Sequence, residues 1–396
     1  MIIYEIATGY TSVPAKIGAA TEIVVEELTK AFINNGIKAK IIDISDSKRA
    51  QTSLPIDEVK VPAFINSEDT SLGILHKAKR VVYSVLLAKK LKKLIKNSDE
   101  ETVLHFHNQY NLFFFFKLTP KKIRQKATIA YTVHSYIWHD DWQTIKNTVK
   151  KRYFQEVFAV KNADIVYVLN DNTVTNFTEH LGCDKEKLCM INNGVNTDIY
   201  YPFAEDVKSE IKNKLGLSGK TVFLQIGSVC DRKNQLGALE LLKPLLCENR
   251  NYVYLYAGGI ITEEYQNSIL AYAKQAGISN QVIYLGELAP GETLNNYYAT
   301  ADLLVFPSKS ESFGMVVIES LASGTPVFIR NTEIDFGAGT ILYNEDNFEE
   351  LFNAYIIDKK DLQINEAARE NAVNKFSWDI IANDYYSYMQ KFIKEN

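Results

Sequence analysis

Cysteine and long apolar runs are both scarce in this chain of 396 residues. Its four cysteines form no CxxC pair, which favours a reducing compartment. Residues 112–116 supply only five apolar residues in a row, against the ~20 that a membrane-spanning helix needs. At the N-terminus, Glu5 interrupts the apolar stretch that a signal peptide would require. We expect a cytoplasmic protein in which any membrane contact is peripheral, at the inner face.

An excess of positive charge and several cofactor motifs are also missing. The formal net charge of -4 gives no reason to expect nucleic acid as a partner. No strand candidate is followed by GxGxxG, which argues against a dinucleotide dehydrogenase. The sequence also has no Asp-x-Asp motif and no evident cluster of metal-ligating residues. We expect neither a metal nor another cofactor.

Short strand-like runs alternate with longer helical patterns along the whole chain. At 396 residues there is room for two domains of roughly 200 residues each. The runs are apolar without strict alternation, which is typical of parallel strands covered on both faces. The first half offers IIYEIA, AKIIDI, TVLHFH, TIAYTVH, IVYVL and LCMIN, and the second TVFLQIG, YVYLYAGG, VIYLG, LLVFPS, PVFI and TILY. We predict an α/β fold with two doubly wound, Rossmann-like domains.

Turn residues, a proline and one short helical piece between residues 192 and 220 place the domain boundary near Tyr200. The predicted domains are residues 1–200 and 201–376. Ligands of open α/β sheets bind beyond the carboxyl ends of the strands, so functional residues are expected there. Residues 377–396 form an amphipathic helix with apolar side chains at helical spacing: Ile380, Ile381, Tyr385, Tyr388, Met389 and Phe392.

The segment SESFGMVVIES, residues 310–320, has a glutamate near each end of an apolar stretch. It follows the strand candidate LLVFPS, turns through residues 309–314 and enters a helix at about Met315. The start of that helix offers unpaired backbone N–H groups and the positive end of the helix dipole, which suit phosphate or sugar oxygens. Gly314 lets the backbone approach a ligand closely.

Glu311 falls in this loop, and Glu319 lies inside the helix. A carboxylate in the loop can accept hydrogen bonds from sugar hydroxyls, and one in the helix can bind a ribose diol. The alternative is a solvated loop acid and a surface helix residue. Because most neighbours of Glu319 are apolar or small, its carboxylate must either face solvent or have a partner.

The longer stretch SESFGMVVIESLASGTPV resembles the signature of the family-four nucleotide-sugar glycosyltransferases, in which two glutamates flank a Phe-Gly loop. INNGVNTDIY resembles that family's domain crossover, and ADIVYVLNDNTVTNF and KFSWDIIANDYYSYM resemble two further segments. The resemblance implies the GT-B architecture. An N-terminal acceptor-binding domain and a C-terminal nucleotide-sugar-binding domain then face a central cleft, and the C-terminal helix crosses back to the first domain.

The resemblance also implies roles for the matching residues. Glu311 would bind hydroxyls of the donor sugar, Glu319 would bind the ribose, and backbone groups around Leu288 would read the edge of the base. Backbone N–H groups of four successive residues would meet the sugar and the diphosphate: Phe313, Gly314, Met315 and Val316.

The segment LQIGSVCDRKNQ combines a turn at Gly227 with two cations, Arg232 and Lys233, that can stabilise a departing diphosphate. In the resembling family an arginine follows the glycine and a lysine stands five residues later. Lys233 matches this lysine, whereas Ser228 stands where the arginine is usual. The alternative for both cations is a solvated basic turn before a helix.

Two features of the first domain also match the family. Gly18, with Ala19 and Ala20, resembles its Gly-Gly loop, in which backbone N–H groups face the diphosphate or the acceptor, although the family's second glycine is missing; a turn that serves packing alone is the alternative. His134 ends the strand candidate TIAYTVH, where the family has a histidine that contacts the donor sugar near the reacting carbon. His107 matches a second family histidine, which shapes the acceptor side or packs. The other four histidines are expected to be structural or at the surface.

The resemblance implies a retaining, metal-independent hexosyltransferase in which Glu311, Lys233, Arg232 and His134 form the catalytic group. It would move glucose or a related hexose from a nucleotide, UDP on frequency alone, to a hydroxyl of a glycan or lipid-linked acceptor, as in polysaccharide or glycoconjugate biosynthesis. No general base stands out, so the leaving phosphate would take the acceptor proton. The departures from the family pattern leave open a non-catalytic nucleotide-sugar-binding subunit, and a same-fold epimerase or phosphorylase.

Residues 72–97 are notable independently of the family, because they hold eight Lys or Arg and no acid. Apolar residues recur there at three- and four-residue steps. Together with residues 113–116 and KKIRQK, this helix could form a basic, apolar patch suited to an anionic membrane or a lipid-linked acceptor. The alternative is a core-facing helix with a solvated lysine face.

Overall fold

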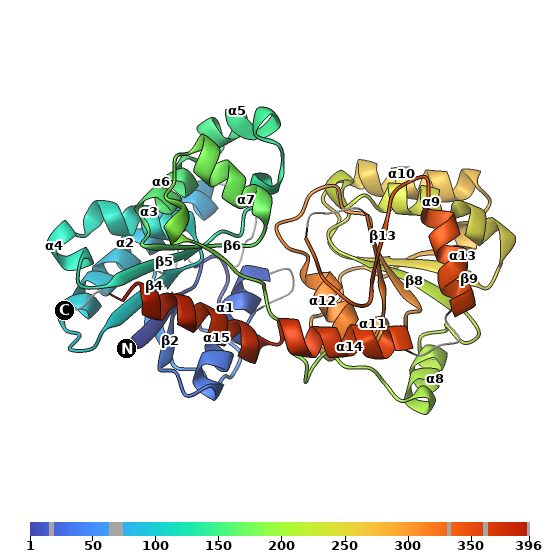
Figure 1. The fold of residues 1–396 in the computed structure, drawn as a ribbon, viewed down its shortest axis with the longest axis horizontal. Coiled ribbons are helices and arrows are strands. Elements are labelled where there is room, and N and C mark those ends of the chain that lie inside the picture. The colour runs from blue at the N-terminus through green and yellow to red at the C-terminus, as the bar shows by residue number, and fades with distance from the viewer. Residues whose placement is uncertain (16–19, 63–73, 331–333, 359–362, 394–396) are drawn as a thin grey trace. The chain divides into compact units, whose positions relative to one another are not determined.

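The structure is a computed structural model that describes residues 1–15, 20–62, 74–330, 334–358 and 363–393. It divides into two compact units (Figure 1). The first unit comprises Met1–Gly194 and Trp378–Asn396, and the second comprises Val195–Ser377. The chain thus enters the second unit once and returns to the first with its C-terminal helix.

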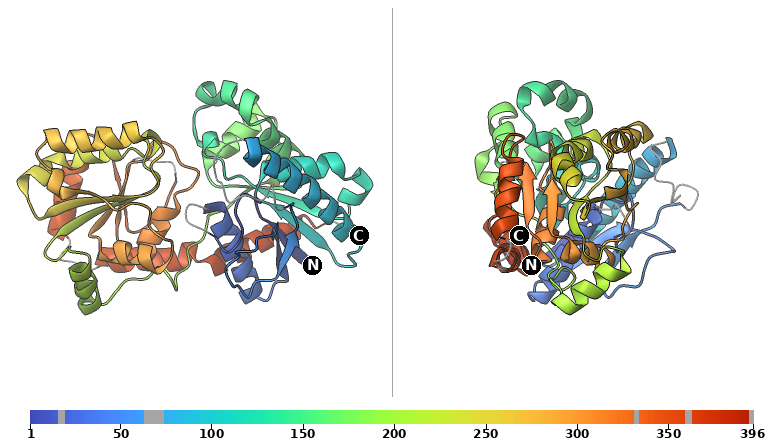
Figure 2. Two further views of the ribbon diagram at one scale, coloured as in Figure 1. Left: turned by 180° about the vertical axis from the view of Figure 1, so that it is seen from behind. Right: turned by 90° about the vertical axis from the view of Figure 1, so that its right-hand side faces the viewer.

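The first unit is built on a parallel sheet in the order β3-β2-β1-β4-β5-β6-β7. Helices cover both faces of this sheet (Figures 1 and 2), which explains why its strands are apolar on both sides. The strands are β1 (Ile2–Ile6), β2 (Ala39–Ile44), β3 (Ile56–Val59), β4 (Thr102–Phe106), β5 (Thr128–Thr132), β6 (Ile165–Val168) and β7 (Leu188–Met190). The helices include α1 (Ala20–Asn34), α2 (Ile74–Lys96), α3 (Gln109–Leu118), α4 (Lys121–Arg124), α5 (Trp142–Arg152), α6 (Phe154–Asn162), α7 (Asp171–Thr175) and α15 (Trp378–Lys391).

The second unit repeats this plan with a parallel sheet in the order β10-β9-β8-β11-β12-β13. Its strands are β8 (Thr221–Ile226), β9 (Tyr252–Ala257), β10 (Val282–Tyr284), β11 (Leu303–Phe306), β12 (Val327–Arg330) and β13 (Thr340–Tyr343). Its helices include α8 (Glu205–Lys214), α9 (Gln235–Glu248), α10 (Glu263–Gln275), α11 (Glu292–Thr300), α12 (Met315–Ala322), α13 (Phe348–Asp358) and α14 (Gln363–Phe376).

The two parallel sheets confirm the predicted α/β class, and each predicted run contains a strand. The sequence does not predict β3, whose residues are IDEV. Asp57 and Glu58 obscure the strand pattern, and they are tolerated because β3 lies at the edge of its sheet.

Helix α15 packs on the first unit through residues that lie far away in the sequence. The Tyr167 hydroxyl donates a hydrogen bond to the carbonyl oxygen of Tyr385 at 3.0 Å. Thr128 Oγ1 donates to the carbonyl oxygen of Phe392 at 3.2 Å. Tyr385 itself is fully buried, so this helix completes the core of the unit.

Helix α2 contains most of the basic stretch and faces the core. Tyr83, Leu87 and Leu91 are buried, whereas Lys89 and Lys93 are exposed. This arrangement is that of a core-facing helix with a solvated lysine face. In the part of the chain that the structure describes, no helix is long and apolar enough to cross a membrane.

Candidate functional site

The loop after β11 leads into α12 through Gly314, a position that only glycine can occupy. Gly314 has a φ of +112° at the start of α12. A Cβ atom at this position would lie 3.0 Å from a ring carbon of Phe306. Both the backbone conformation and the close packing therefore require glycine. Helix α12 begins at Met315, as predicted, and its first N–H groups lie at the end of the loop.

The structure brings together three of the predicted residues, Glu311, Lys233 and Arg232. Nζ of Lys233 lies 2.5 Å from Oε1 of Glu311, and Nη1 of Arg232 lies 3.2 Å from Oε2. Arg232 Nη1 also donates to the carbonyl oxygen of Ser310 at 2.9 Å. Two cations beside one carboxylate leave an excess of one positive charge, so this cluster is suited to an anionic ligand.

The backbone and the side chain of Lys233 are both held in place. Gln225 Nε2 donates to the carbonyl oxygen of Lys233 at 2.7 Å, and the Tyr254 hydroxyl donates to Gln225 Oε1 at 2.6 Å. Gly227 has a φ of +147°, and a Cβ atom there would lie 3.2 Å from Cε of Lys233. Gly227 therefore makes room for the lysine. Only 14% of the Lys233 side chain is exposed, so the alternative of a fully solvated basic turn does not describe this residue.

Glu319 has partners rather than solvent around its carboxylate. It is 8% exposed, and the Tyr298 hydroxyl donates to its Oε2 at 2.8 Å. The Tyr200 hydroxyl is a second hydrogen-bond partner. Burial raises the pKa of Glu319 to about 7, although both tyrosines oppose this shift. The alternative of a surface helix residue is therefore wrong.

The remaining predicted residues of the second unit fall into two groups. Phe313 is buried, and its ring centroid lies 5.4 Å from that of Phe336, so only its backbone can face a ligand. Met315, Val316 and Leu288 are partly exposed. Gly18 of the first unit, with Ala19, lies outside the described residues.

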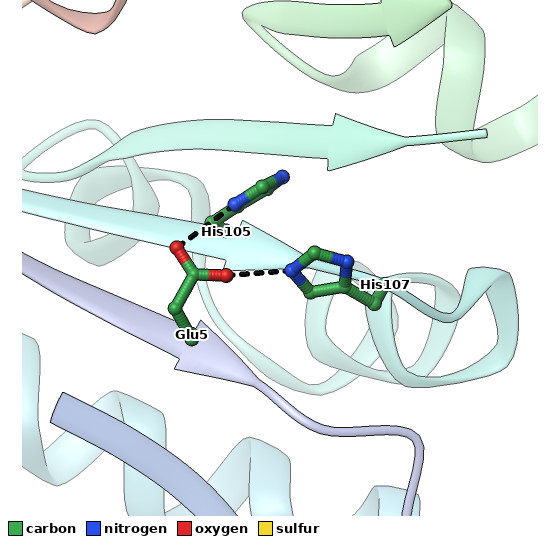
Figure 3. Close-up of side chains that lie close together, drawn as sticks. All are labelled: Glu5, His105 and His107. Atoms are coloured by element: carbon green, nitrogen blue, oxygen red, sulfur yellow. Dashed lines mark hydrogen bonds and ion pairs between the residues drawn. The ribbon is translucent and has the colours of Figure 1, made fainter. Parts of the chain in front are cut away.

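In the first unit, His134 follows β5 and ends a chain of hydrogen-bonded side chains. Its Nε2 lies 3.0 Å from Nδ1 of His107, whose Nε2 lies 2.6 Å from Oε2 of Glu5. Oε1 of Glu5 lies 2.9 Å from Nδ1 of His105 (Figure 3). Nε2 of His105 lies 2.7 Å from Oγ1 of Thr132. His134 is partly exposed, whereas the other members are buried.

Burial and hydrogen bonding shift the pKa values along this chain in consistent directions. Burial opposes ionisation of Glu5, but its interactions with His105 and His107 outweigh burial and lower the Glu5 pKa to about 2. Burial, together with nearby His105, lowers the pKa of His107 to about 4. Burial and His107 lower the pKa of His134 well below its usual value. His107 and His134 are therefore neutral imidazoles at pH 7.

Glu5, His105 and His107 also have the donor types of a divalent metal site, and one possible ligand atom of each lies within 4.8 Å of the others. In this structure, however, both carboxylate oxygens are hydrogen-bonded to ring nitrogens. The second nitrogen of each ring is also hydrogen-bonded, to Thr132 or to His134. The geometry is that of a hydrogen-bonded chain.

A buried carboxylate, Glu156 of α6, anchors the loop that follows His134. It accepts hydrogen bonds from the Tyr131 hydroxyl at 2.8 Å, Ser135 Oγ at 3.0 Å and Trp138 Nε1 at 2.9 Å. Three donors thus hold β5 and the next few residues to one helix. The backbone of His134 lies between two of these anchored residues and is fixed by them.

The sequence predicts no role for Glu5 and only a structural or surface place for His105. Glu5 lies opposite His105 in the parallel register of β1 and β4. His107 follows at alternate spacing just beyond β4. An acid in a buried strand beside a His-x-His strand was the available signal, but it depends on knowing that β1 and β4 are neighbours.

Two family models match most of the chain. Residues 21–199 match "Glycosyltransferase Family 4", and residues 207–370 match "Glycosyl transferases group 1". The chain belongs to the family-four glycosyltransferases, as its motifs predict. The solved structure of HepE of Anabaena with UDP and glucose has a TM-score of 0.71 at 17% identity, with 98% of this chain and 99% of that chain covered. This likeness supports the GT-B fold.

Curated relatives match over a shorter stretch. Mannosylfructose-phosphate synthase of Agrobacterium fabrum is 28% identical over 187 residues, which is 46% of this chain and 40% of that protein. Alpha-monoglucosyldiacylglycerol synthase of Streptococcus pneumoniae is 29% identical over 200 residues, or 46% of this chain and 44% of that protein. The chain thus spans about half the length of the curated relatives it matches.

Proposed function

We propose that the protein is a retaining hexosyltransferase that uses a nucleotide sugar and whose second unit binds the donor. The observation that carries this proposal is the cluster of Glu311, Lys233 and Arg232 beside the start of α12. A diphosphate in this cluster would pair with the two cations. The Glu311 carboxylate would then be released to accept hydrogen bonds from sugar hydroxyls.

In the proposed reaction, the bond between the anomeric carbon and the diphosphate oxygen breaks. The acceptor hydroxyl oxygen bonds to the same face of that carbon, and its proton passes to the departing diphosphate. Lys233, Arg232 and the first N–H groups of α12 stabilise the charge that develops on the leaving oxygens. The side chains thus supply the positive charge that another transferase would draw from a metal ion.

The same proposal includes a specific donor, a UDP-hexose, and a class of acceptor. HepE, a fold relative, has been solved with UDP and glucose, which supports a UDP-hexose. Glu319 would hold the ribose, and backbone groups near Leu288 would face the base. The first unit would bind the acceptor, a hydroxyl of a glycan or a lipid-linked compound, in the cytoplasm or at the inner membrane face.

A donor screen tests this proposal. The purified protein is incubated with UDP-, GDP- and ADP-hexoses, and binding is read by thermal shift and turnover by product mass. We expect UDP-hexose to give the largest thermal shift and to yield either free hexose or a glycosylated acceptor. No shift with any of the three nucleotides would contradict the assignment of the second unit.

A non-catalytic nucleotide-sugar-binding subunit is the second candidate, and Ser228 is the observation that favours it. The family has arginine at this position, so the leaving diphosphate would lack one usual cation. Thermal stabilisation by UDP-hexose without any release of UDP would favour this reading. Conversion of the nucleotide sugar to an isomer would instead identify an epimerase.

A further inference from the structure

Glu5 lies at the centre of a chain of side chains that ends at His134. We infer that Glu5, acting through His107, is a positioning residue that holds His134 in the tautomer with its proton on Nε2. His134 then presents Nδ1 to the substrate as a hydrogen-bond acceptor. The effect on sugar transfer rests on the function proposed above, whereas the tautomer itself does not.

The first step concerns the carboxylate. Both oxygens of Glu5 lie within hydrogen-bond distance of an imidazole nitrogen, at 2.9 Å for His105 Nδ1 and 2.6 Å for His107 Nε2. An ionised carboxylate can only accept hydrogen bonds, so each of these nitrogens must carry its proton. The lowered pKa of Glu5 supports the ionised form.

The second step concerns the two histidines that follow. A neutral imidazole carries one proton, and His107 has placed its proton on Nε2, so its Nδ1 can only accept. Nε2 of His134 lies 3.0 Å from this Nδ1 and must therefore donate to it. The Nδ1 atom of His134 keeps its lone pair. Among the described residues, that atom has no hydrogen-bond partner.

The other branch of the chain leads away from His134. His105 Nε2 is hydrogen-bonded to Thr132 Oγ1, which lies 3.4 Å from the hydroxyl of Tyr385 on α15. Thr132 is fully buried, and its hydroxyl is hydrogen-bonded to His105 and Tyr385. Removing this hydroxyl disturbs the same core without touching the tautomer of His134, which makes Thr132 a matched control.

The chemical consequence lies at the partly exposed end of the chain. With its backbone fixed by the Glu156 network and its proton turned inward, His134 can accept a hydrogen bond from a substrate hydroxyl but cannot donate one at Nδ1. A sugar hydroxyl is a donor and meets this requirement. A cationic or Nδ1-protonated His134 would instead turn an N–H toward the hydroxyl and misorient the sugar.

Nitrogen-15 NMR of the histidine-labelled full-length protein at pH 7 tests the tautomer, with a His134→Gln sample to assign the signals. We expect His134 and His107 to carry hydrogen on Nε2 and to have an unprotonated Nδ1. Protonation of Nδ1 in either residue would overturn the inference. Elemental analysis of the same sample provides an independent check, because one equivalent of bound divalent metal would identify a metal site instead.

Two variants then separate positioning from packing. In Glu5→Leu, His107 loses its acceptor at Nε2 and shifts its proton to Nδ1, which forces His134 to accept at Nε2 and to carry its own proton on Nδ1. We expect this change in the spectrum and a kcat that falls roughly tenfold to a hundredfold, with UDP affinity unchanged. Thr132→Val should retain both the wild-type tautomers of His107 and His134 and at least half of the wild-type kcat.

An unchanged His134 tautomer in Glu5→Leu, or an equal loss of kcat in Thr132→Val, would overturn the positioning role. If Glu5→Leu does not fold, the wild-type spectrum still decides the tautomer. If the wild-type protein transfers no sugar but its tautomers follow the expected pattern, the proposed function fails while the hydrogen-bonded chain stands.

Discussion

Nζ of Lys233 lies 2.5 Å from Oε1 of Glu311, although the two residues belong to loops that follow different strands. Lys233 comes after β8 and Glu311 after β11, and these strands are neighbours in one parallel sheet. The carboxyl ends of neighbouring parallel strands lie at the same edge. Sheet topology therefore brings together the lysine and the carboxylate that we propose to bind the diphosphate and the sugar.

Replacing Lys233 tests the cation at the proposed diphosphate site. We expect Lys233→Ala to lower kcat for sugar release roughly a hundredfold to a thousandfold, because a preorganised positive charge on the leaving oxygens is lost. Lys309→Ala is the matched control, since Lys309 lies in the same region, is 44% exposed and pairs with Asp231 at 2.8 Å. Similar losses in both variants would show that the effect is not specific to Lys233.

Glu311→Gln separates sugar binding from nucleotide binding. The change removes the charge that pairs with Lys233 and Arg232, so both cations become more available to a diphosphate. We expect UDP to bind at least as tightly as in the wild type while kcat falls strongly, as measured by calorimetry and by sugar release. Weaker UDP binding together with a normal kcat would contradict this prediction.

The buried Glu319 carboxyl predicts a pH dependence of stability. Its pKa rises from 4.5 in the unfolded chain to about 7 in the folded protein, so the folded state holds its proton more tightly. The carboxyl therefore destabilises the fold progressively as pH rises from about 4.5 to 7, by roughly 3 kcal/mol in all. Below that window, both states are protonated and there is no penalty.

Urea unfolding of Glu319→Gln at pH 5 and pH 7.5 measures this effect. Relative to wild type, we expect the variant to have a larger free energy of unfolding, and so to be more stable, at pH 7.5 than at pH 5. Glu22, whose pKa burial raises to about 6, titrates in the same window but is present in both proteins. A difference between variant and wild type that is the same at both pH values would exclude a raised Glu319 pKa.

Because Gly227 makes room for Lys233, we expect a larger residue at position 227 to displace the lysine and lower activity. In Gly227→Ala, the new Cβ atom would lie 3.2 Å from Cε of Lys233. The backbone φ at this position also disfavours any residue with a side chain. Gly277→Ala is the control, because its φ of +69° is also disfavoured but no atom lies within 4 Å of the new Cβ. We expect both to lower the melting temperature, and only Gly227→Ala to lower kcat by tenfold or more.

The fold could be predicted from the sequence because each strand run is a local pattern of apolar residues. Strand β3 was not predicted, because its two acids break that pattern at a sheet edge where charge is tolerated. The loop containing Glu311 and the start of α12 were also predicted, since glycine and the apolar helix pattern mark them locally.

The partners of the site residues could not be predicted in the same way. Tyr298 is hydrogen-bonded to Glu319 only because α11 and α12 pack together. The sequence near either residue does not indicate this contact. Glu5 and His107 meet because β1 and β4 are adjacent, a relationship that depends on the order of all seven strands. Contacts of this kind belong to tertiary structure.

Proton NMR of UDP-α-glucose incubated with the wild-type protein and with Lys233→Ala tests the central claim most directly. We predict that the wild type consumes the nucleotide sugar and that the first-formed product retains the α configuration, while Lys233→Ala leaves the donor almost intact. Equal consumption by both proteins, or a β-configured first product, would contradict the account.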